Sequence, residues 1–354
     1  MNHSKVKHNL YRIGLLILVI ATIIVIIFAS STSPSMQHNI GIASIKKAFT
    51  DHQESVWKVH FSKDGKLIAS CSIDSTVLVR DKESGKVISR LKHPAGVTNF
   101  ALSDDGNYIA TSSYDEKVRL WRFSDSHLIK EFAGHEGTVW TVDISKDGKT
   151  IASGGEDKTI RLWSTETGAL LNAIPAHKRN IWSIKFHPTS PIIASSSFDN
   201  DIKLWSTATG ALIKTLSSHT EAVVDIAFNA DGNLLASAAD DASLKIWSVN
   251  EGKLLKTLST NEHQHAVAFS PDGKRIVGGG SDKPMFGEFL QHLFGDSHRN
   301  KGVSMRIWDV ATGGVLQTFT YHSNDVNGVA YSKDGRWIAS ASADQTVSLW
   351  EVTK

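Results

Sequence analysis

Short apolar runs alternate with polar turns along most of the chain, and this pattern repeats at a fixed period. The segment from His135 to Ile174 returns from His177 and again from His219. The histidines that begin such segments are His52, His93, His135, His177, His219 and His322, and the first five are 41 or 42 residues apart. A period of about 40 residues indicates a supersecondary unit that is repeated many times.

Each unit contains four apolar runs, and the first, such as Val139–Ile144, alternates between apolar and polar positions. An Asp-Gly pair, which favours a tight hairpin turn, follows this run in six units and begins at Asp64, Asp105, Asp147, Asp231, Asp272 and Asp334. The fourth unit has Pro188 and Pro191 instead. Four runs predict a four-stranded antiparallel sheet with two apolar faces, which become buried when the sheets pack around a ring.

Seven units fit the sequence, and they begin near residues 52, 93, 135, 177, 219, 260 and 322. The seventh ends at Lys354 after its third run, while residues 42–49 stand alone before the first unit. We predict that residues 42–49 pair with the last sheet and close the ring, which removes an exposed strand edge. The predicted fold class is therefore all-β, a seven-bladed β-propeller of four-stranded antiparallel blades over residues 42–354.

Each unit also offers a histidine, a serine or threonine, an aspartate and a tryptophan at constant spacing. These are His135, Ser153, Asp157 and Trp163 in the third unit, and His177, Ser195, Asp199 and Trp205 in the fourth. Together with the period, these residues resemble the WD-repeat β-propeller family over about residues 42–354. The resemblance implies that the four side chains form a structural hydrogen-bond network. Their repetition also argues against a Ser-His-Asp catalytic triad, and we predict no catalytic residue.

Two units depart from this set. Arg80 replaces the tryptophan after His52, Ser70 and Asp74 in the first unit. The sixth unit has Gly278 in place of the serine and no leading histidine, with Thr260 near that place. We expect the sixth blade to be the least stable.

The resemblance implies that partners bind the face with the loop before the first strand and the loop after the second strand of each blade. We call this the upper face. Five aromatic residues are expected there, namely Trp57, Trp140 and Trp182, each five positions after a leading histidine, and Tyr114 and Phe198, each just before a turn aspartate. Tryptophan and tyrosine dominate binding hot spots. The alternative is that these rings pack within the protein against the first strands.

A second candidate surface is an insertion in the sixth blade, residues 283–302. Met285, Phe286, Phe289, Leu290, Leu293 and Phe294 fall there on one side of a predicted helix. Such a helix would cover the propeller, bind a partner, contact a membrane or pack on its own blade. His263, His265, His292 and His298 are expected near one another, but nothing fixes their spacing for Zn²⁺ or Cu²⁺, so we predict neither a metal site nor a cofactor.

Composition narrows the choice of partners. The chain has 38 Lys and Arg against 36 Asp and Glu. Residues 1–12 contribute Lys5, Lys7 and Arg12 without an acid, so residues 13–354 carry 35 basic and 36 acidic side chains, a net charge of −1. This argues against nucleic-acid binding, which requires a basic face. The single cysteine, Cys71, excludes an intramolecular disulfide.

Residues 13–29 contain no charge, and thirteen of these seventeen residues are Ile, Leu, Val or Phe. This run predicts a transmembrane signal anchor over residues 13–30, with a cytoplasmic basic tail at 1–12 and a linker at 31–41. The propeller would then be exported as part of a single-pass protein, and the scarcity of cysteine favours the periplasmic side of a bacterial inner membrane. A signal peptide cleaved near Ala29 and the inverted orientation are the alternatives.

These features predict a non-catalytic, membrane-tethered scaffold that binds protein partners through the upper face. Two other functions stay open. One is a receptor for a small molecule or metal beneath the sixth-blade insertion, and the other is a propeller enzyme with its active site in the central channel. A ring fold hosts many functions, so the sequence does not identify the partner.

Overall fold

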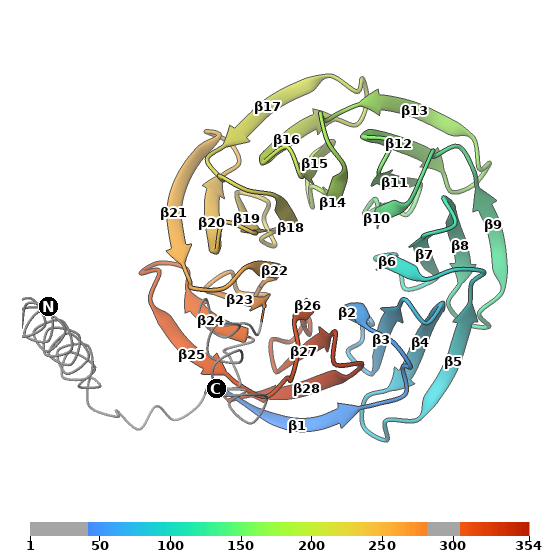
Figure 1. Cartoon of the computed structure of the whole chain (residues 1–354). Helices are drawn as coiled ribbons and strands as arrows, with labels where there is room; N and C mark the ends of the chain where they lie inside the picture. Colours follow the sequence, from blue (N-terminus) through green and yellow to red (C-terminus); the bar gives the residue numbers. More distant parts are fainter. Residues whose placement is uncertain (1–41, 282–304, 354) are drawn as a thin grey trace, which may run out of the picture. The chain divides into compact units, whose positions relative to one another are not determined.

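The computed structural model describes residues 42–281 and 305–353. In this part of the chain, 28 β-strands form seven four-stranded antiparallel sheets. Figure 1 shows the sheets as the blades of a ring, with the first strand of each blade nearest the axis. The predicted seven-bladed propeller is therefore confirmed.

The strands of blades one to four follow the order of the chain from the axis outward. Blade one contains β2 (Val56–Phe61), β3 (Leu67–Ser72), β4 (Thr76–Asp81) and β5 (Val87–Lys92). Blade two contains β6 (Val97–Leu102), β7 (Tyr108–Ser113), β8 (Val118–Arg122) and β9 (Leu128–Phe132). Blade three contains β10 (Val139–Ile144), β11 (Thr150–Gly155), β12 (Thr159–Ser164) and β13 (Leu170–Pro175). Blade four contains β14 (Ile181–Phe186), β15 (Ile192–Ser197), β16 (Asp201–Ser206) and β17 (Leu212–Ser217).

The last three blades complete the ring. Blade five contains β18 (Val223–Phe228), β19 (Leu234–Ala239), β20 (Ser243–Ser248) and β21 (Lys253–Ser259). Blade six contains β22 (Gln264–Phe269), β23 (Arg275–Gly280), β24 (Met305–Asp309) and β25 (Val315–Phe319). Blade seven contains β26 (Val326–Tyr331), β27 (Trp337–Ser342), β28 (Val347–Val352) and, as its outermost strand, β1 (Ala43–Phe49).

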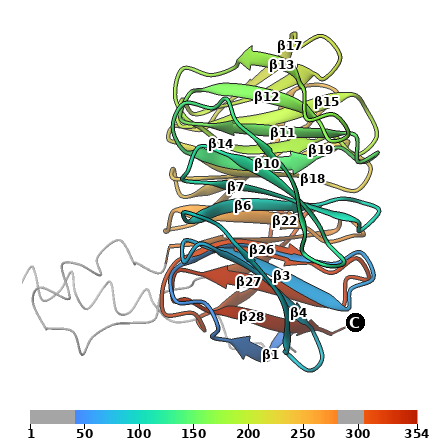
Figure 2. The ribbon, with the colours of Figure 1, turned by 90° about the vertical axis from the view of Figure 1, so that its right-hand side faces the viewer.

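The hydrophobic core lies between neighbouring blades. Ile160 and Leu162 of blade three, for example, pack in one buried cluster with Ile181 and Ile184 of blade four. In the side view of Figure 2 the blades run between two faces of the ring, and each sheet is covered by its neighbours. This arrangement buries both faces of every sheet, which explains the apolar runs that recur in each unit of the sequence.

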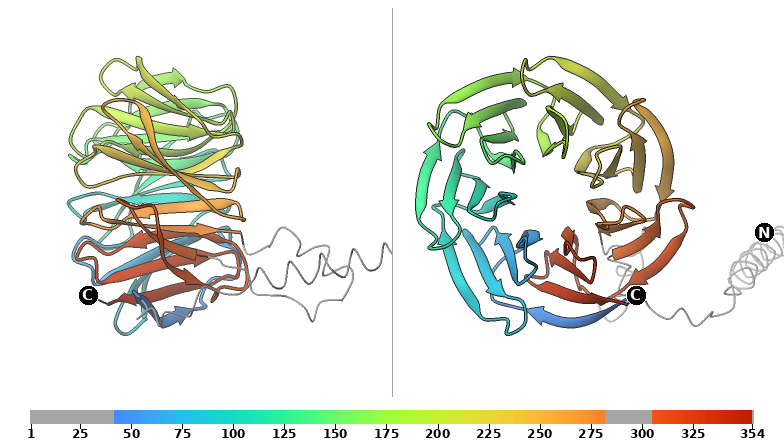
Figure 3. Two further views of the ribbon diagram at one scale, coloured as in Figure 1. Left: turned by 90° about the vertical axis from the view of Figure 1, so that its left-hand side faces the viewer. Right: turned by 180° about the vertical axis from the view of Figure 1, so that it is seen from behind.

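The first strand of the chain closes the ring in the way that the sequence predicts for residues 42–49. β1 pairs with β28 from Ala43 opposite Val352 to Phe49 opposite Val347. The Phe49 ring is buried and lies beneath the Arg80 guanidinium of blade one, 4.5 Å from it. Figure 3 shows the same closed ring from behind. The outer edge of β28 is thereby covered by a strand from the other end of the propeller.

The Asp-Gly turns lie on the opposite face of the ring, which we call the lower face. Their six glycines have φ between +68° and +79°, which favours glycine because it lacks a Cβ. Two predicted segments, the anchor at residues 13–30 and the insertion at residues 283–302, lie outside the described residues. Among residues 42–281 and 305–353, no element is a helix with the length and hydrophobicity of a membrane span.

Candidate partner-binding cavity

A β-bulge interrupts the innermost strand of every blade at the same place. In blade one, for example, the pairing of β2 with β3 passes from Val56 to Lys58 and leaves out Trp57. The residues omitted in this way are Trp57, Thr98, Trp140, Trp182, Val224, His265 and Asn327. All seven line one cavity of about 260 Å³. A bulge redirects the side chain of its extra residue, here toward the axis of the ring.

Five aromatic rings from four blades form a continuous series at this cavity. The ring centroids are 5.5 Å apart for Tyr114 and Trp140, 4.5 Å for Trp140 and Trp182, and 4.7 Å for Trp182 and Phe198. Trp57 joins the series by stacking on Trp140 at 5.7 Å. Such offset and edge-to-face pairs are the favoured aromatic geometries. The series brings together all five aromatic residues that the sequence placed on the upper face.

These rings combine the two interpretations that the sequence left open. The three tryptophans are half-buried and pack against one another, whereas Tyr114 keeps 37% of its surface exposed. Trp57, Trp140, Trp182 and Phe198 also line the cavity. The rings are therefore internally packed and still present one wall to an incoming group.

The wall from blades five to seven is more polar. Asp240, His265 and Asn327 lie on it, beside Val224. Burial raises the pKa of Asp240 and lowers that of His265, so both side chains favour their neutral forms more than they would in water. His265 was considered in the sequence only as one of four histidines near the insertion, and was not placed at the axis, because the sixth unit lacks a leading histidine. Counting five positions from Thr260, which stands near that place, would have found it.

An ion pair spans the ring beneath the aromatic series. Lys58 Nζ of blade one lies 3.1 Å from Asp225 Oδ2 of blade five. Asp225 also accepts hydrogen bonds from Ser183 Oγ of blade four at 3.1 Å and from the Val267 amide of blade six at 3.2 Å. One carboxylate thus links four blades, and nothing in the repeat pattern marked it.

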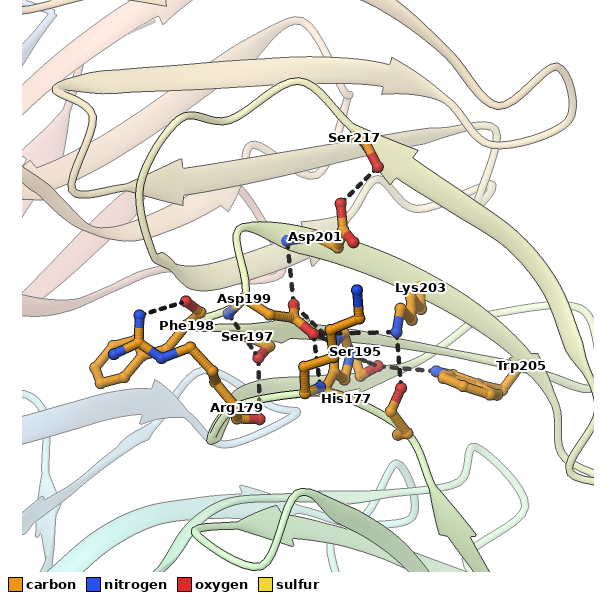
Figure 4. Close-up of polar contacts among 12 residues, drawn as sticks. His177, Arg179, Ser195, Ser197, Phe198, Asp199, Asp201, Lys203, Trp205 and Ser217 are labelled. Carbon is orange, nitrogen blue, oxygen red and sulfur yellow. Dashed lines mark hydrogen bonds and ion pairs between the residues drawn. The ribbon is translucent and has the colours of Figure 1, made fainter.

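The predicted network of histidine, serine, aspartate and tryptophan is present in blades three and four. In blade four, shown in Figure 4, Trp205 Nε1 donates to Ser195 Oγ at 2.9 Å, and His177 lies 2.7 Å from Ser195 Oγ and 3.0 Å from Asp199. In blade three the equivalent distances are 2.9 Å for Trp163 to Ser153, 2.7 Å for His135 to Ser153 and 2.9 Å for His135 to Asp157.

The hydrogen bonds in this network determine the direction of donation. Because the indole N–H donates to the serine oxygen, the serine hydroxyl can donate to histidine Nε2, and histidine Nδ1–H donates to the aspartate. Ser153 and Ser195 are completely buried, so a substrate carbonyl cannot reach either hydroxyl. The network therefore links neighbouring strands, and its serine hydroxyls are not accessible as nucleophiles.

Blade two departs from the set although its four residues are all present in the sequence. His93 and Trp121 both bond to Thr111 Oγ1, but Arg119 takes both carboxylate oxygens of Asp115, at 3.1 and 2.6 Å. His93 Nδ1 is buried and has no hydrogen-bond partner among the described residues. Burial and the nearby Arg119 lower the pKa of His93 to about 4. An arginine on the third strand thus displaces the histidine.

The remaining predicted site residues cannot be placed. Phe286, Phe289, Leu290 and Leu293 of the insertion lie outside the described residues, as do His292 and His298. Within the described part of the chain, no group of three or more His, Cys, Asp or Glu side chains could hold a metal ion.

Comparison with known families accounts for the repeat. The family model described as "WD domain, G-beta repeat" matches seven segments, residues 43–81, 85–122, 126–164, 168–206, 210–248, 252–283 and 313–351. The chain belongs to the WD40 repeat family. WD40 propellers are generally non-catalytic interaction scaffolds, which agrees with the buried serines of the network.

Individual relatives match only short stretches. A coronin-like protein of Saccharomyces cerevisiae is 37% identical over 92 residues, which is 26% of this chain and 14% of that protein. Actin-interacting protein 1 of Drosophila melanogaster is 34% identical over 85 residues, or 23% of this chain and 14% of the relative. COMPASS component SWD3 of S. cerevisiae is 30% identical over 94 residues, or 27% of this chain and 30% of the relative. The matched stretches span less than a third of each relative.

Proposed function

We propose that this WD40 propeller is a non-catalytic scaffold that binds protein partners on its upper face, with the aromatic series as the principal contact. The observation that carries the proposal is the continuous series of five rings from four blades along one wall of the cavity. Large rigid aromatic side chains contribute much of the binding energy in protein interfaces. Trp140 and Trp182 do not belong to the buried cluster between blades three and four, which is built from residues such as Ile160 and Ile184, and both keep partly exposed surface for a partner.

The N-terminal segment supports a second part of the proposal, a single-pass membrane tether at residues 13–30 with a cytoplasmic N-terminus and an exported propeller. Its support is the uncharged apolar run at 13–29, with Lys5, Lys7 and Arg12 before it and no Lys or Arg between it and Lys46. Ala43, where the chain enters the propeller, pairs with Val352 near the lower face. A reporter fused after Lys354 tests this part, and reporter activity on the cytoplasmic side would contradict it.

Site-specific crosslinking in intact cells tests the scaffold function. A photoreactive phenylalanine analogue placed at Tyr114, on the upper face, should form an adduct with a partner protein. The same analogue at Lys146, an exposed residue of a lower-face turn, should form none. Adding Trp182→Ala should reduce the adduct at least fivefold, because it removes the ring that bridges Trp140 and Phe198.

A matched variant separates binding from folding. Trp337→Ala removes another half-buried tryptophan, which lies beneath Lys82 Nζ at 4.5 Å near the lower face. It should leave the adduct at Tyr114 unchanged. Equal adducts at Tyr114 and Lys146, or an equal loss in the two tryptophan variants when both melt at similar temperatures, would refute the proposal.

A further inference from the structure

The cavity at the ring axis is small and chemically two-sided. Its volume of about 260 Å³ is below the roughly 300–1,000 Å³ of typical pockets for small molecules. Trp57, Trp140, Trp182 and Phe198 form one wall, and Asp240, His265 and Asn327 lie on the other. A single side chain of a bound partner suits this size better than a separate drug-sized ligand.

The charges around the cavity favour a cation. Lys58 also lines it, but its ammonium group is paired with Asp225 at 3.1 Å. His265 is shifted toward its neutral form by burial. Asp240 is the acid that lines the cavity, and its nearest basic neighbour among the described ion pairs is His263 at 3.7 Å. Burial raises the pKa of Asp240, and a cation beside the carboxylate would offset that shift by favouring its ionised form. Glu221 acts on Asp240, and Asp325 acts on His265, so further acids surround this wall.

Two buried polar atoms of the lining residues have no hydrogen-bond partner in the described structure. They are Asn99 Oδ1, an acceptor on a side chain that is only 2% exposed, and Trp140 Nε1, a donor. A buried polar group without a partner costs about 1–3 kcal/mol, so a ligand that supplies partners gains affinity. The missing groups are a donor for Asn99 and an acceptor for Trp140. Both atoms are almost fully covered, so these side chains must turn toward the cavity before a ligand can bond to them.

We propose that the cavity binds an arginine side chain from the partner protein. The planar guanidinium stacks on the indole wall and forms a charge-assisted hydrogen bond with Asp240. A turn of the Asn99 amide toward the cavity brings its Oδ1 to the guanidinium as a further acceptor. The Trp140 indole N–H donates to a backbone carbonyl of the same partner segment. This inference rests on the proposed function, because it specifies what the partner presents to the aromatic series.

The protein already pairs an arginine guanidinium with an aromatic ring at the margin of the cavity. The Arg179 guanidinium carbon stands 5.9 Å from the centroid of the Phe198 ring, and its Nη1 donates to the Phe198 carbonyl at 3.3 Å. A lysine ammonium satisfies the charge but does not stack as a plane, and an anion would face Asp240 and its acidic neighbours. Arginine is therefore the occupant that matches both walls.

Peptide binding to the full-length chain in detergent micelles tests this proposal. The probes are the peptide Ac-Gly-Ala-Arg-Ala-Gly-NH2 and the same peptide with citrulline, which keeps the shape of arginine and removes the charge. Isothermal titration calorimetry should show at least tenfold tighter binding of the arginine peptide. Asp240→Asn should abolish this preference, whereas Glu251→Gln, an exposed acid of blade five in a lower-face turn, should leave it intact.

Trp140→Phe provides a second readout because it keeps an aromatic ring and removes the N–H donor. It should weaken both peptides by a similar factor and leave their ratio unchanged. Equal affinities for the two peptides, retention of the tenfold preference in Asp240→Asn, or no binding of either peptide at millimolar concentration would overturn the inference. Crosslinking from Tyr114 would still uphold the proposed function in each case, so the two failures are distinguishable.

Discussion

Replacing Gly278 by serine tests how blade six is held together. Four complete blades place a serine at this position, and blade two places a threonine, and each hydroxyl accepts from the tryptophan of the third strand. Restoring the serine would therefore be expected to repair blade six. The structure predicts the opposite, because a Cβ at Gly278 would lie 2.7 Å from Leu244 Cδ1 and 2.9 Å from Trp308 Cζ3.

The orientation of the indole decides the magnitude. The atoms of Trp308 that approach Gly278 are Cζ3 and Cη2, which belong to the six-membered ring and lie away from the Nε1 donor. The new serine hydroxyl would lie against carbon atoms of the Trp308 ring, so it would not gain the hydrogen bond to the indole N–H, worth about 1 kcal/mol, unless the ring turned. Forcing extra atoms into a packed core costs about 1–3 kcal/mol. We expect Gly278→Ser to lower the melting temperature by roughly 2–6 °C.

Thermal and urea unfolding of the full-length chain, followed by far-ultraviolet circular dichroism, measure this effect. The cost of the serine should shrink in a Trp308→Phe background, where the smaller ring leaves room, and a double-mutant cycle reports that coupling. The reciprocal change Ser237→Gly in blade five should also destabilise, because it leaves His219 Nε2 and Trp247 Nε1 without the shared hydroxyl. A rise in stability for Gly278→Ser, or an equal cost in both backgrounds, would refute the reasoning.

Two further predictions concern the closing strand and acid stability. Phe49→Ala should lower the free energy of unfolding by about 3–5 kcal/mol, because the Phe49 ring of β1 is buried and packs beneath Arg80 of blade one. Ile45→Ala, at a position of β1 that is 38% exposed, should cost under about 1 kcal/mol. Equal costs of the two substitutions in urea unfolding would contradict a closed ring. Acidification from pH 7 to pH 5 should lower the free energy of unfolding. Burial lowers the pKa of His60 to about 3 and that of His93 to about 4. Both histidines therefore stay neutral in the folded chain while they bind protons in the unfolded chain, which favours unfolding as the pH falls. His60→Gln should flatten the pH profile, and an unfolding free energy that stays constant between pH 7 and pH 5 would be inconsistent with buried neutral histidines.

The sequence predicts the fold because the repeat fixes the spacing of strands and turns. It also places Trp57, Trp140 and Trp182 correctly beside the axis, since they share one position in the unit. It does not predict which side chains meet across the axis, and the pair of Lys58 and Asp225 shows this limit. Each residue lies in its own unit at an unremarkable position, and only the closed ring brings blades one and five together.

The network in blade two shows a second limit of sequence reasoning. His93, Thr111, Asp115 and Trp121 have the expected identities and spacing, yet the bond from His93 to Asp115 is absent because Arg119 binds the carboxylate. Blade three also has an arginine at the equivalent position, and there Arg161 shares Asp157 with His135. Blade two differs at two other positions, because Thr111 replaces the serine and Arg119 is also bonded to Glu131 of the fourth strand at 2.7 Å, whereas Ala173 lies opposite Arg161 in blade three. The difference therefore involves a neighbour outside the four-residue motif.

The bulge positions explain why the repeat can carry a specific site. The residue just before each bulge is Val56, Val97, Val139, Ile181, Val223, Gln264 or Val326, and all seven are almost completely buried. The core therefore restricts this position to small aliphatic residues in six of the seven blades. The next residue turns toward the axis and escapes that restriction, so it varies from tryptophan to threonine, valine, histidine and asparagine. The fold does not impose the division into an aromatic wall and a polar wall. A ligand that depends on both walls would be held in one orientation, which a symmetric ring could not achieve.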